Sequence, residues 1–289
     1  MSYIAEFRNV SFTYNKGVSY ETKAIDNVSA GIERNCTTGI IGATGSGKST
    51  LIQMLNGLLK PEEGTVIIDG IDIFQKKVKM REIRFRVGLV MQYPEYQLFD
   101  ETVASDIAFG PKNMGIKGEE LDKRVLEAAR FAGLDEELLQ KSPFDLSGGQ
   151  KRRAALAGVM AMEPDLLVLD EPAAGLDPLG RREILGKIQN YQRERETSVI
   201  IVSHSMEDIA KYCDRLIVMS HGKIAANDTT QNVFRRHTEL SDVGLDVPEI
   251  TKAASALEKL GVGIGEDIYT VKYAAEKLIE KFGITKKAK

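Results

Sequence analysis

The sequence lacks long apolar runs, and it contains few cysteines and little net charge. No stretch approaches the ~20 apolar residues that a helix needs to cross a bilayer, so any membrane association is expected to occur through a partner. The first residues show no basic segment followed by an apolar run, and we expect no secretory signal. Cys36 and Cys213 are too few for a disulfide framework and are expected to be free, buried thiols. A formal net charge of −3 gives no electrostatic reason to expect nucleic acid as a partner.

Apolar residues recur along the chain with the periods of both strands and helices. A hydrophobic fraction of 43% over 289 residues is typical of one large globular domain, or of one domain with an appendage. Continuous apolar runs predict parallel strands that are covered on both faces, and the helical segments between them predict β-α-β units and an α/β fold. The predicted strands are 3–34 with a turn near 15–17, 37–41, 66–68, 87–91, 166–169, 198–203 and 215–219. The predicted helices run from 48 to about 57–61, then over 103–109, 121–131, 149–162, 250–260 and 271–282.

A glycine-rich segment follows the predicted strand 37–41 and opens the helix that starts at Lys48. Glycines allow backbone N–H groups to converge on phosphate oxygens, and the start of a helix adds its positive end. Lys48 is expected to reach the β- and γ-phosphates of a nucleotide, and Ser49 to offer its hydroxyl to Mg²⁺. A flexible glycine-rich loop without a ligand is the alternative, but it would not need a strand before it and a helix after it. The predicted phosphate-binding residues are Gly42, Ala43, Thr44, Gly45, Ser46, Gly47, Lys48, Ser49 and Thr50.

Two adjacent carboxylates, Asp170 and Glu171, end the apolar run 166–169. At the carboxyl end of a buried strand, Asp170 is expected to hold Mg²⁺ directly or through water. Glu171 is expected to polarise the water that attacks the γ-phosphate. A charged pair that merely caps a loop is the alternative.

A short segment between the phosphate-binding loop and the acidic pair narrows the family. It consists of Leu146, Ser147, Gly148, Gly149 and Gln150. It resembles the signature of ATP-binding-cassette (ABC) ATPases, and the resemblance extends over about 3–226. It implies a P-loop NTPase fold of the ABC ATPase type with a helical signature subdomain and ATP as the nucleotide. In that family the signature completes the ATP site of a partner subunit, so hydrolysis is expected to require a second ATPase subunit. Ser147 could also simply cap the following helix.

The resemblance assigns roles to four more residues. Gln92 is similar to the glutamine that senses Mg²⁺ and the attacking water, and His204 to the histidine that contacts the γ-phosphate. Asp177 resembles the aspartate at the dimer seam. Tyr14 resembles the aromatic residue that stacks on adenine, although a half-buried strand aromatic is the alternative. Thr50 is placed at the α-phosphate. The implied metal ligands are Ser49, Gln92 and Asp170.

Three segments are similar to a narrower group, the ATPase subunits of energy-coupling factor (ECF) transporters, which import vitamins and transition-metal ions such as cobalt and nickel. They are 93–99, 148–153 and 244–251, and the stretch 93–102 is more similar to the second of two paralogous ATPases. The resemblance implies a second ATPase subunit, a transmembrane coupling protein and a membrane-embedded substrate-binding subunit as partners. It implies a peripheral location on the cytoplasmic side of the cell membrane. The segment after Gln92 would line the groove that accepts coupling helices.

The same resemblance divides the chain in two. An ABC nucleotide-binding domain is expected over 1–227, with its helical subdomain at about 93–162. A small helical extension, for dimerisation or regulation, is expected over 228–289. Two other function classes remain: a soluble ABC ATPase of translation or DNA maintenance, and a P-loop kinase of small metabolites. The first usually shows a second cassette, a coiled-coil insertion or strongly basic segments, and the second does not need the signature.

Overall fold

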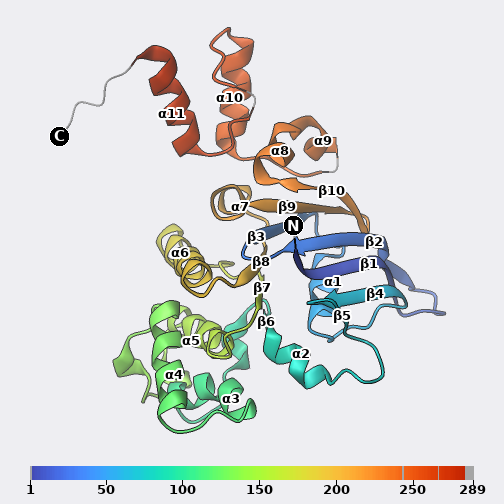
Figure 1. Cartoon of the computed structure of the whole chain (residues 1–289). Coiled ribbons are helices and arrows are strands. Elements are labelled where there is room, and N and C mark those ends of the chain that lie inside the picture. The colour runs from blue at the N-terminus through green and yellow to red at the C-terminus, as the bar shows by residue number, and fades with distance from the viewer. Residues whose placement is uncertain (1, 243, 266, 284–289) are drawn as a thin grey trace.

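A mainly parallel six-stranded sheet runs through the centre of the molecule (Figure 1). The computed structural model describes residues 2–242, 244–265 and 267–283, so the end of the predicted C-terminal extension, 284–289, lies outside the described residues. The strand order is β10-β9-β3-β8-β7-β6; β10 pairs antiparallel with β9, and the other pairs are parallel. The strands are β3 (Thr37–Gly42), β6 (Val87–Val90), β7 (Leu166–Asp170), β8 (Ser198–Val202), β9 (Arg215–Ser220) and β10 (Lys223–Thr229).

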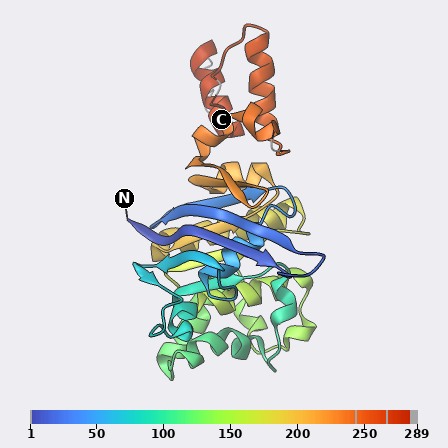
Figure 2. The same cartoon turned by 90° about the vertical axis from the view of Figure 1, so that its right-hand side faces the viewer.

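A second, antiparallel sheet covers one face of the first, with α1 (Lys48–Leu55) packed among residues of both sheets. Figure 2 shows the long strands of this sheet crossing the front of the molecule. Its order is β2-β1-β4-β5, formed by β1 (Tyr3–Tyr14), β2 (Thr22–Glu33), β4 (Glu63–Ile68) and β5 (Ile71–Asp72). The helix α2 (Met80–Arg86) leads into β6.

Side chains of β7 alternate between two hydrophobic clusters, as the pleat of a strand requires. Leu166 and Val168 belong to the cluster shared with α1, whereas Leu167 and Leu169 belong to the cluster on the opposite face. That opposite face is covered by helices that include α5 (Gly148–Met160), α6 (Pro178–Arg195) and α7 (Met206–Tyr212). Both faces of the strand are therefore buried, as the continuous apolar run predicts.

A helical subdomain is inserted between β6 and β7 and lies at one end of the molecule (Figure 1). Its helices α3 and α4 are amphipathic, and Thr102 caps α3 by accepting a hydrogen bond from the Ser105 N–H. Besides α5, it contains α3 (Val103–Asn113), α4 (Glu119–Ala132) and the short 3₁₀ helices η1 (Pro94–Gln97), η2 (Glu136–Leu138) and η3 (Pro143–Asp145).

In the described part of the C-terminal segment, four further helices follow β10. Figures 1 and 2 show α10 and α11 side by side at the end of the molecule farthest from the helical subdomain. They pack through a small apolar cluster of their own, whereas Leu245 and Val247, just before α10, join the main core. The helices are α8 (Thr230–Arg235), α9 (His237–Asp242), α10 (Glu249–Lys259) and α11 (Val271–Phe282).

The predicted α/β class and the ABC-type arrangement of elements are confirmed. The sequence did not predict the short 3₁₀ helices or α2, β5, β10, α8 and α9, and it predicted α6 and α7 only as helical connections between strands, without bounds. The expectation for the cysteines is half right, because both thiols are free but only Cys213 is buried, Cys36 being partly exposed. Among the described residues, no helix combines the length and apolarity that a membrane span demands.

Candidate active site

Four parallel strands end at one edge of the central sheet and carry the predicted site residues there. β3 ends in Gly42, where the glycine-rich loop begins, and β7 ends in Asp170. The register pairs Asp170 with Val202 of β8 and Val90 of β6 with Leu169, so Gln92 and His204 follow the two strands that flank β7. Ligand sites of parallel sheets lie at this edge because the loops that leave the carboxyl ends of the strands meet there.

The glycine-rich loop is held close to β2 and β9 by contacts that only glycines permit. A Cβ on Gly42 would lie 2.4 Å from the carbonyl oxygen of Met219. A Cβ on Gly47 would lie 2.4 Å from the carbonyl oxygen of Ala24, and the φ of Gly47 is 101°. Immediately after Gly47, α1 begins, so its unpaired N–H groups face the loop.

Lys48 is held within the loop that it is expected to serve. Its Nζ donates to the carbonyl oxygens of Gly42 at 2.8 Å and Ala43 at 3.0 Å, and the residue is 6% exposed. Burial lowers the pKa of Lys48, and the nearby carboxylates of Glu171 and Asp170 oppose that shift. The cation therefore faces the acidic strand end across the loop.

A carboxylate and a hydroxyl, those of Asp170 and Ser49, lie together at the junction of β7 and α1. Burial raises the pKa of Asp170, whereas a hydrogen bond with the Ser49 side chain and the charge of Lys48 act in the opposite direction. Among the described residues, no group of three or more His, Cys, Asp or Glu side chains gathers as a metal site. One carboxylate and one hydroxyl fit Mg²⁺, which keeps water and phosphate oxygens as its other ligands.

Glu171 occupies an unusual backbone conformation directly after the strand. Its φ is 51°, and its N–H donates to the carbonyl oxygen of Val202 at 3.0 Å. Among the described residues, Oε1 of Glu171 is buried without a hydrogen-bond donor, and it lies 3.5 Å from Nε2 of His204. Burial, followed by the charge of Asp170, raises the pKa of Glu171 to about 7. A carboxylate with this pKa can accept a proton near neutral pH.

His204 and Gln92 are both more accessible than the carboxylates. The His204 side chain is 54% exposed, and its pKa is lowered by partial burial and by the charge of Lys48. Gln92 is exposed. Both can therefore meet a ligand that enters from solvent.

Tyr14 ends β1 beside the start of α1. Its hydroxyl and the Thr50 hydroxyl are 3.2 Å apart, and its ring packs edge-on against Phe12 at 4.9 Å between centroids. The residue is 37% exposed, so part of its surface is open to solvent. The structure thus links Tyr14 to Thr50, and stacking on adenine stays a prediction.

The signature segment lies in the helical subdomain, away from α1 (Figure 1). Ser147 caps α5: its Oγ accepts from the Gln150 N–H at 3.3 Å, and its own N–H donates to Gln150 Oε1 at 2.9 Å. The capping role is therefore confirmed. Leu146 is buried, and a Cβ on Gly148 or Gly149 would meet open space. The two glycines leave the start of α5 accessible to another molecule.

Asp177 caps α6, where its Oδ1 accepts from the Gly180 N–H at 2.7 Å. The residue is exposed. Like Ser147, it is an N-cap residue whose side-chain oxygen accepts a hydrogen bond from a backbone N–H of the helix.

One residue near the site was missed by the sequence reasoning. Arg181, in the first turn of α6, lines a pocket of about 380 Å³ together with Glu171, His204 and Asp208. Its Nη1 lies 3.4 Å from Oδ2 of Asp208. Its closeness to Glu171 depends on how α6 and α7 pack, and the only local signal is its position four residues after Asp177.

Comparisons with known proteins show which family this chain is similar to. A family model described as ABC transporter matches residues 25–174. An energy-coupling factor transporter ATP-binding protein EcfA2 from Caldanaerobacter subterraneus subsp. tengcongensis is 53% identical over 278 residues, 96% of this chain and 97% of that protein. The EcfA2 of Clostridium tetani is 51% identical over 96% of each chain.

Solved structures agree in fold. The cbiO1 protein of Clostridium perfringens, described as part of the ABC transporter complex cbiONQ, superposes with a TM-score of 0.74 at 37% identity, over 86% of this chain and 98% of that one. The ATP-binding cassette MJ0796, solved as a dimer in a post-hydrolysis state with ADP and Pi, gives 0.71 at 28% identity, over 78% and 98%. The protein is thus an ABC ATPase, and it belongs to the ATP-binding proteins of energy-coupling factor transporters.

Proposed function

We propose that this chain binds Mg-ATP and hydrolyses it together with a second ATPase subunit, and that hydrolysis drives an ECF-type importer. The observation that carries this proposal is the convergence of Lys48, Asp170 and Glu171 at one sheet edge, with the unpartnered Oε1 of Glu171 turned toward His204. This arrangement joins a phosphate-binding cation to a proton acceptor with a pKa of about 7.

Each residue has a defined part in this reaction. The loop 42–50 holds the phosphates, with Lys48 on the β- and γ-phosphates. Mg²⁺, held by Ser49, Asp170 and Gln92, would offset the charge that gathers on the phosphate oxygens. Glu171 takes a proton from the attacking water, and His204 holds the γ-phosphate. Tyr14 stacks on the adenine.

The partner ATPase supplies what this chain's site lacks. We propose that Ser147 and the two open glycines after it cover the γ-phosphate held by the partner, and that the partner's signature does the same here. Asp177 would lie at the seam between the subunits. Its exposed position at the start of α6 and the free space above Gly148 and Gly149 support this arrangement.

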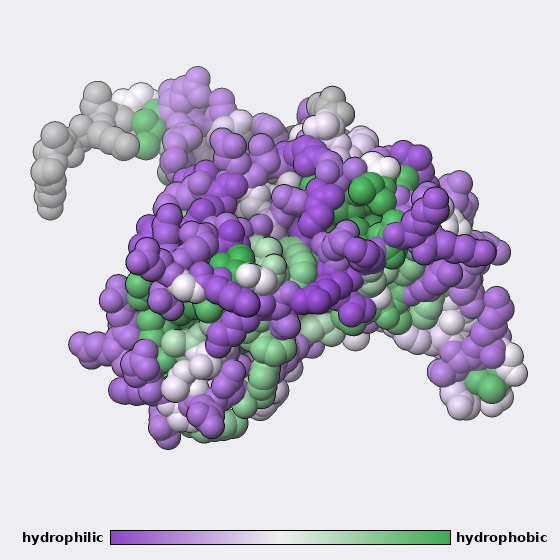
Figure 3. Space-filling model, turned by 60° about the horizontal axis from the view of Figure 1, so that its bottom comes forward, coloured by the Kyte–Doolittle hydropathy of each residue, from purple (hydrophilic) through white to green (hydrophobic). Residues whose placement is uncertain are grey.

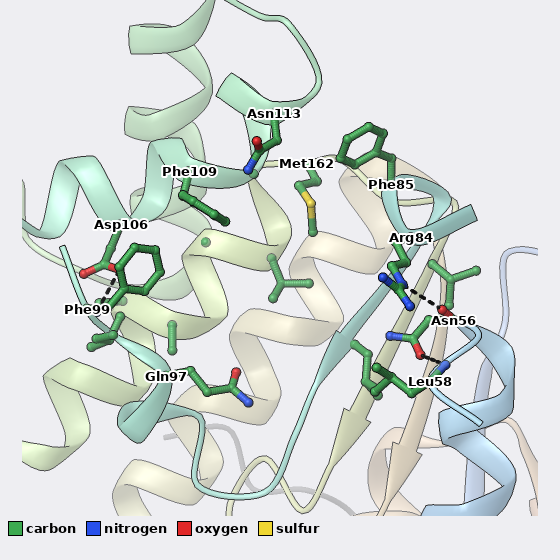
Figure 4. Close-up of a pocket in the computed structure, with 18 residues that line it drawn as sticks. Asn56, Leu58, Arg84, Phe85, Gln97, Phe99, Asp106, Phe109, Asn113 and Met162 are labelled. Atoms are coloured by element: carbon green, nitrogen blue, oxygen red, sulfur yellow. Dashed lines mark hydrogen bonds between the residues drawn. The ribbon is translucent and has the colours of Figure 1, made fainter. Parts of the chain in front are cut away.

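A groove between α2 and the helical subdomain is the proposed docking site for the transmembrane coupling protein. Figure 4 shows Phe85 and Leu58 on one side of it, Phe109 on the other, and Met162 between them. It has a volume of about 380 Å³. Phe99 and Phe109, which pack edge-on at 5.0 Å, are 59% and 50% exposed. Figure 3, which brings this side of the molecule forward, shows apolar surface among the polar atoms. An amphipathic helix buries its apolar face in such a groove.

The remaining parts of the proposal rest on the relatives. We propose a peripheral location at the cytoplasmic side of the cell membrane, with a membrane-embedded substrate-binding subunit as a further partner and vitamins or transition-metal ions as cargo. The EcfA2 relatives favour the second of two paralogous ATPases. We propose that 1–227 form the nucleotide-binding domain, with its helical subdomain at about 93–162, and that 228–289 serve dimerisation or regulation.

Purification of the tagged chain from gently solubilised membranes tests this function. Recovery of a paralogous ATPase with one coupling membrane protein and several small membrane proteins is expected. A copy of this chain with one dedicated membrane set would instead indicate a single-cargo importer. Recovery with ribosomes or DNA-bound proteins would favour a soluble ABC ATPase.

A matched pair of variants tests the groove in the same preparation. Phe109→Asp places a charge in the groove and is expected to lose the membrane proteins. Tyr20→Asp places the same charge at a residue that is 67% exposed in the turn between β1 and β2, and it is expected to keep them. Equal recovery from both variants would refute docking at this groove.

A further inference from the structure

A buried arginine joins three segments that are distant in the sequence. Arg152 lies in α5 and is 5% exposed. Its Nε donates to Oε2 of Glu95 at 3.1 Å, and its Nη2 donates to Oε1 of Glu95 at 2.9 Å. Its Nη1 donates to the carbonyl oxygen of Ala174. The planar guanidinium thus uses a different N–H for each of three acceptors, which an ammonium group cannot reproduce.

The three segments each carry a different part of the proposed machinery. Glu95 lies in η1, which follows Gln92 and leads into the wall of the groove. Arg152 lies in the helix that starts at Ser147. Ala174 lies in the loop between Glu171 and Asp177, where its N–H donates back to the carbonyl oxygen of Glu171 at 3.1 Å.

The pair is rigid for physical reasons. Both side chains are largely removed from water, with exposed fractions of 6% for Arg152 and 16% for Glu95. A buried charge that loses its partner is strongly destabilised, so neither side chain can move alone. Burial tends to raise the pKa of Glu95, but the hydrogen bonds from Arg152 hold that pKa below its ordinary value. Glu95 therefore stays ionised and bound. A displacement of η1 must carry the guanidinium with it.

We propose that Arg152 is a positioning residue that couples the docking groove to both ATP half-sites of this chain: to Ser147 through α5, and to Glu171 through the Ala174 carbonyl. This inference rests on the proposed function. Arg152 is not proposed to contact the nucleotide. It sets where the signature and the catalytic carboxylate stand when a coupling helix presses on η1.

The test uses Arg152→Lys and Glu95→Gln in the assembled transporter purified from membranes. Arg152→Lys keeps the charge but cannot serve both carboxylate oxygens and Ala174. Glu95→Gln keeps the shape and the Ala174 bond but loses the ion pair. Arg124→Met is the matched control, because the Arg124 side chain is also largely buried (19% exposed) and pairs with Glu120 of its own helix and with Glu163, just beyond the end of the subdomain. Thermal unfolding of each complex checks the fold. If Arg152→Lys fails to assemble, Glu95→Gln carries the test.

If Arg152 couples the groove to the ATP sites, its loss should lower kcat for ATP hydrolysis but leave KM for ATP nearly unchanged. Both variants are expected to lower kcat for ATP hydrolysis about tenfold while KM for ATP changes less than about twofold, because ATP binding depends on the loop 42–50. Arg124→Met is expected to leave both constants near those of the unmodified complex. A loss of kcat no larger than that of Arg124→Met overturns the proposal. An unmodified complex without ATPase activity would instead refute the proposed function.

Two backgrounds separate the two routes. Glu171→Gln in this chain silences the site that holds this chain's own nucleotide. The remaining hydrolysis takes place at the partner's nucleotide, which this chain's Ser147 covers. A further loss of hydrolysis on adding Arg152→Lys therefore supports the route through α5. Ser147→Asp silences the partner's site, so the remaining hydrolysis uses this chain's Glu171; a further loss there supports the route through Ala174. If adding Arg152→Lys causes no further loss of hydrolysis in one of these backgrounds, the corresponding route is overturned.

Discussion

Oε1 of Glu171 lies 3.5 Å from Nε2 of His204, while the Glu171 N–H donates to the carbonyl oxygen of Val202, two residues before that histidine. The backbone segments that carry the proposed catalytic carboxylate and the histidine are therefore held side by side by the pairing of β7 and β8. A shift of the Glu171 backbone would disturb this edge of the sheet, where its N–H bonds to β8.

The rate of hydrolysis is expected to depend on pH through Glu171. Burial raises the pKa of this carboxyl to about 7, and only its ionised form can accept a proton from water. kcat of the assembled complex should therefore rise as the pH rises through about 7. Steady-state rates between about pH 5.5 and about pH 9 measure this. A profile that is flat through neutrality would show that Glu171 is not the base.

Replacing the base should separate ATP binding from hydrolysis. Glu171→Gln keeps the size of the side chain but cannot accept the proton, so hydrolysis should fall by about 100-fold or more. ATP should still bind, and the two ATPases should accumulate in the closed dimer. Single-turnover hydrolysis and size analysis with ATP measure both effects. Near-normal turnover in the assembled complex would contradict the assignment, whereas Lys48→Ala should instead weaken ATP binding itself.

The same substitution should change how stability depends on pH. The folded protein binds the Glu171 proton more tightly than the unfolded chain, where the pKa is near its ordinary value of 4.5. Ionisation of Glu171 therefore lowers the free energy of unfolding progressively as the pH rises from about 4.5 to about 7. Glu171→Gln removes this loss and should be more stable than the unmodified chain at about pH 8, by on the order of 2 kcal/mol, but not at about pH 4. Denaturant unfolding at both pH values checks this; equal differences would contradict the raised pKa.

Ser147 should show its two roles in different assays. Ser147→Ala removes the helix cap and should lower the free energy of unfolding by about 1 kcal/mol. Ser147→Asp keeps a capping oxygen, so it should be as stable as the unmodified chain, yet its charge would repel the partner's γ-phosphate and suppress hydrolysis. Thr229→Ala, which removes the cap of α8, is the control for stability alone. Normal hydrolysis by the Asp variant would contradict the role of Ser147 at the partner's site.

The sequence predicts the parts of this fold whose signal is local. Continuous apolar runs predict β7, β8 and β9, and the glycine-rich motif predicts the start of α1. β10 was missed because Lys223–Thr229 alternates between exposed and half-buried positions with Ile224 as its single large apolar residue, and it forms by pairing with β9. The Glu95–Arg152 pair was missed for a similar reason: no periodicity links two side chains that meet only after the helical subdomain has folded. The motifs name the site residues, but the raised pKa of Glu171 comes from burial by distant segments.

The position of β3 also governs when the protein can first bind its nucleotide. Thr37 pairs with Val199 of β8, and Gly42 pairs with Met219 of β9. The strand that carries the phosphate-binding loop is therefore made long before either of its neighbours leaves the ribosome, and such non-local pairings form slowly. Nascent chains that end before β9 cannot hold the loop in place. We therefore expect ATP binding to appear only when nearly the whole cassette has been synthesised and folded.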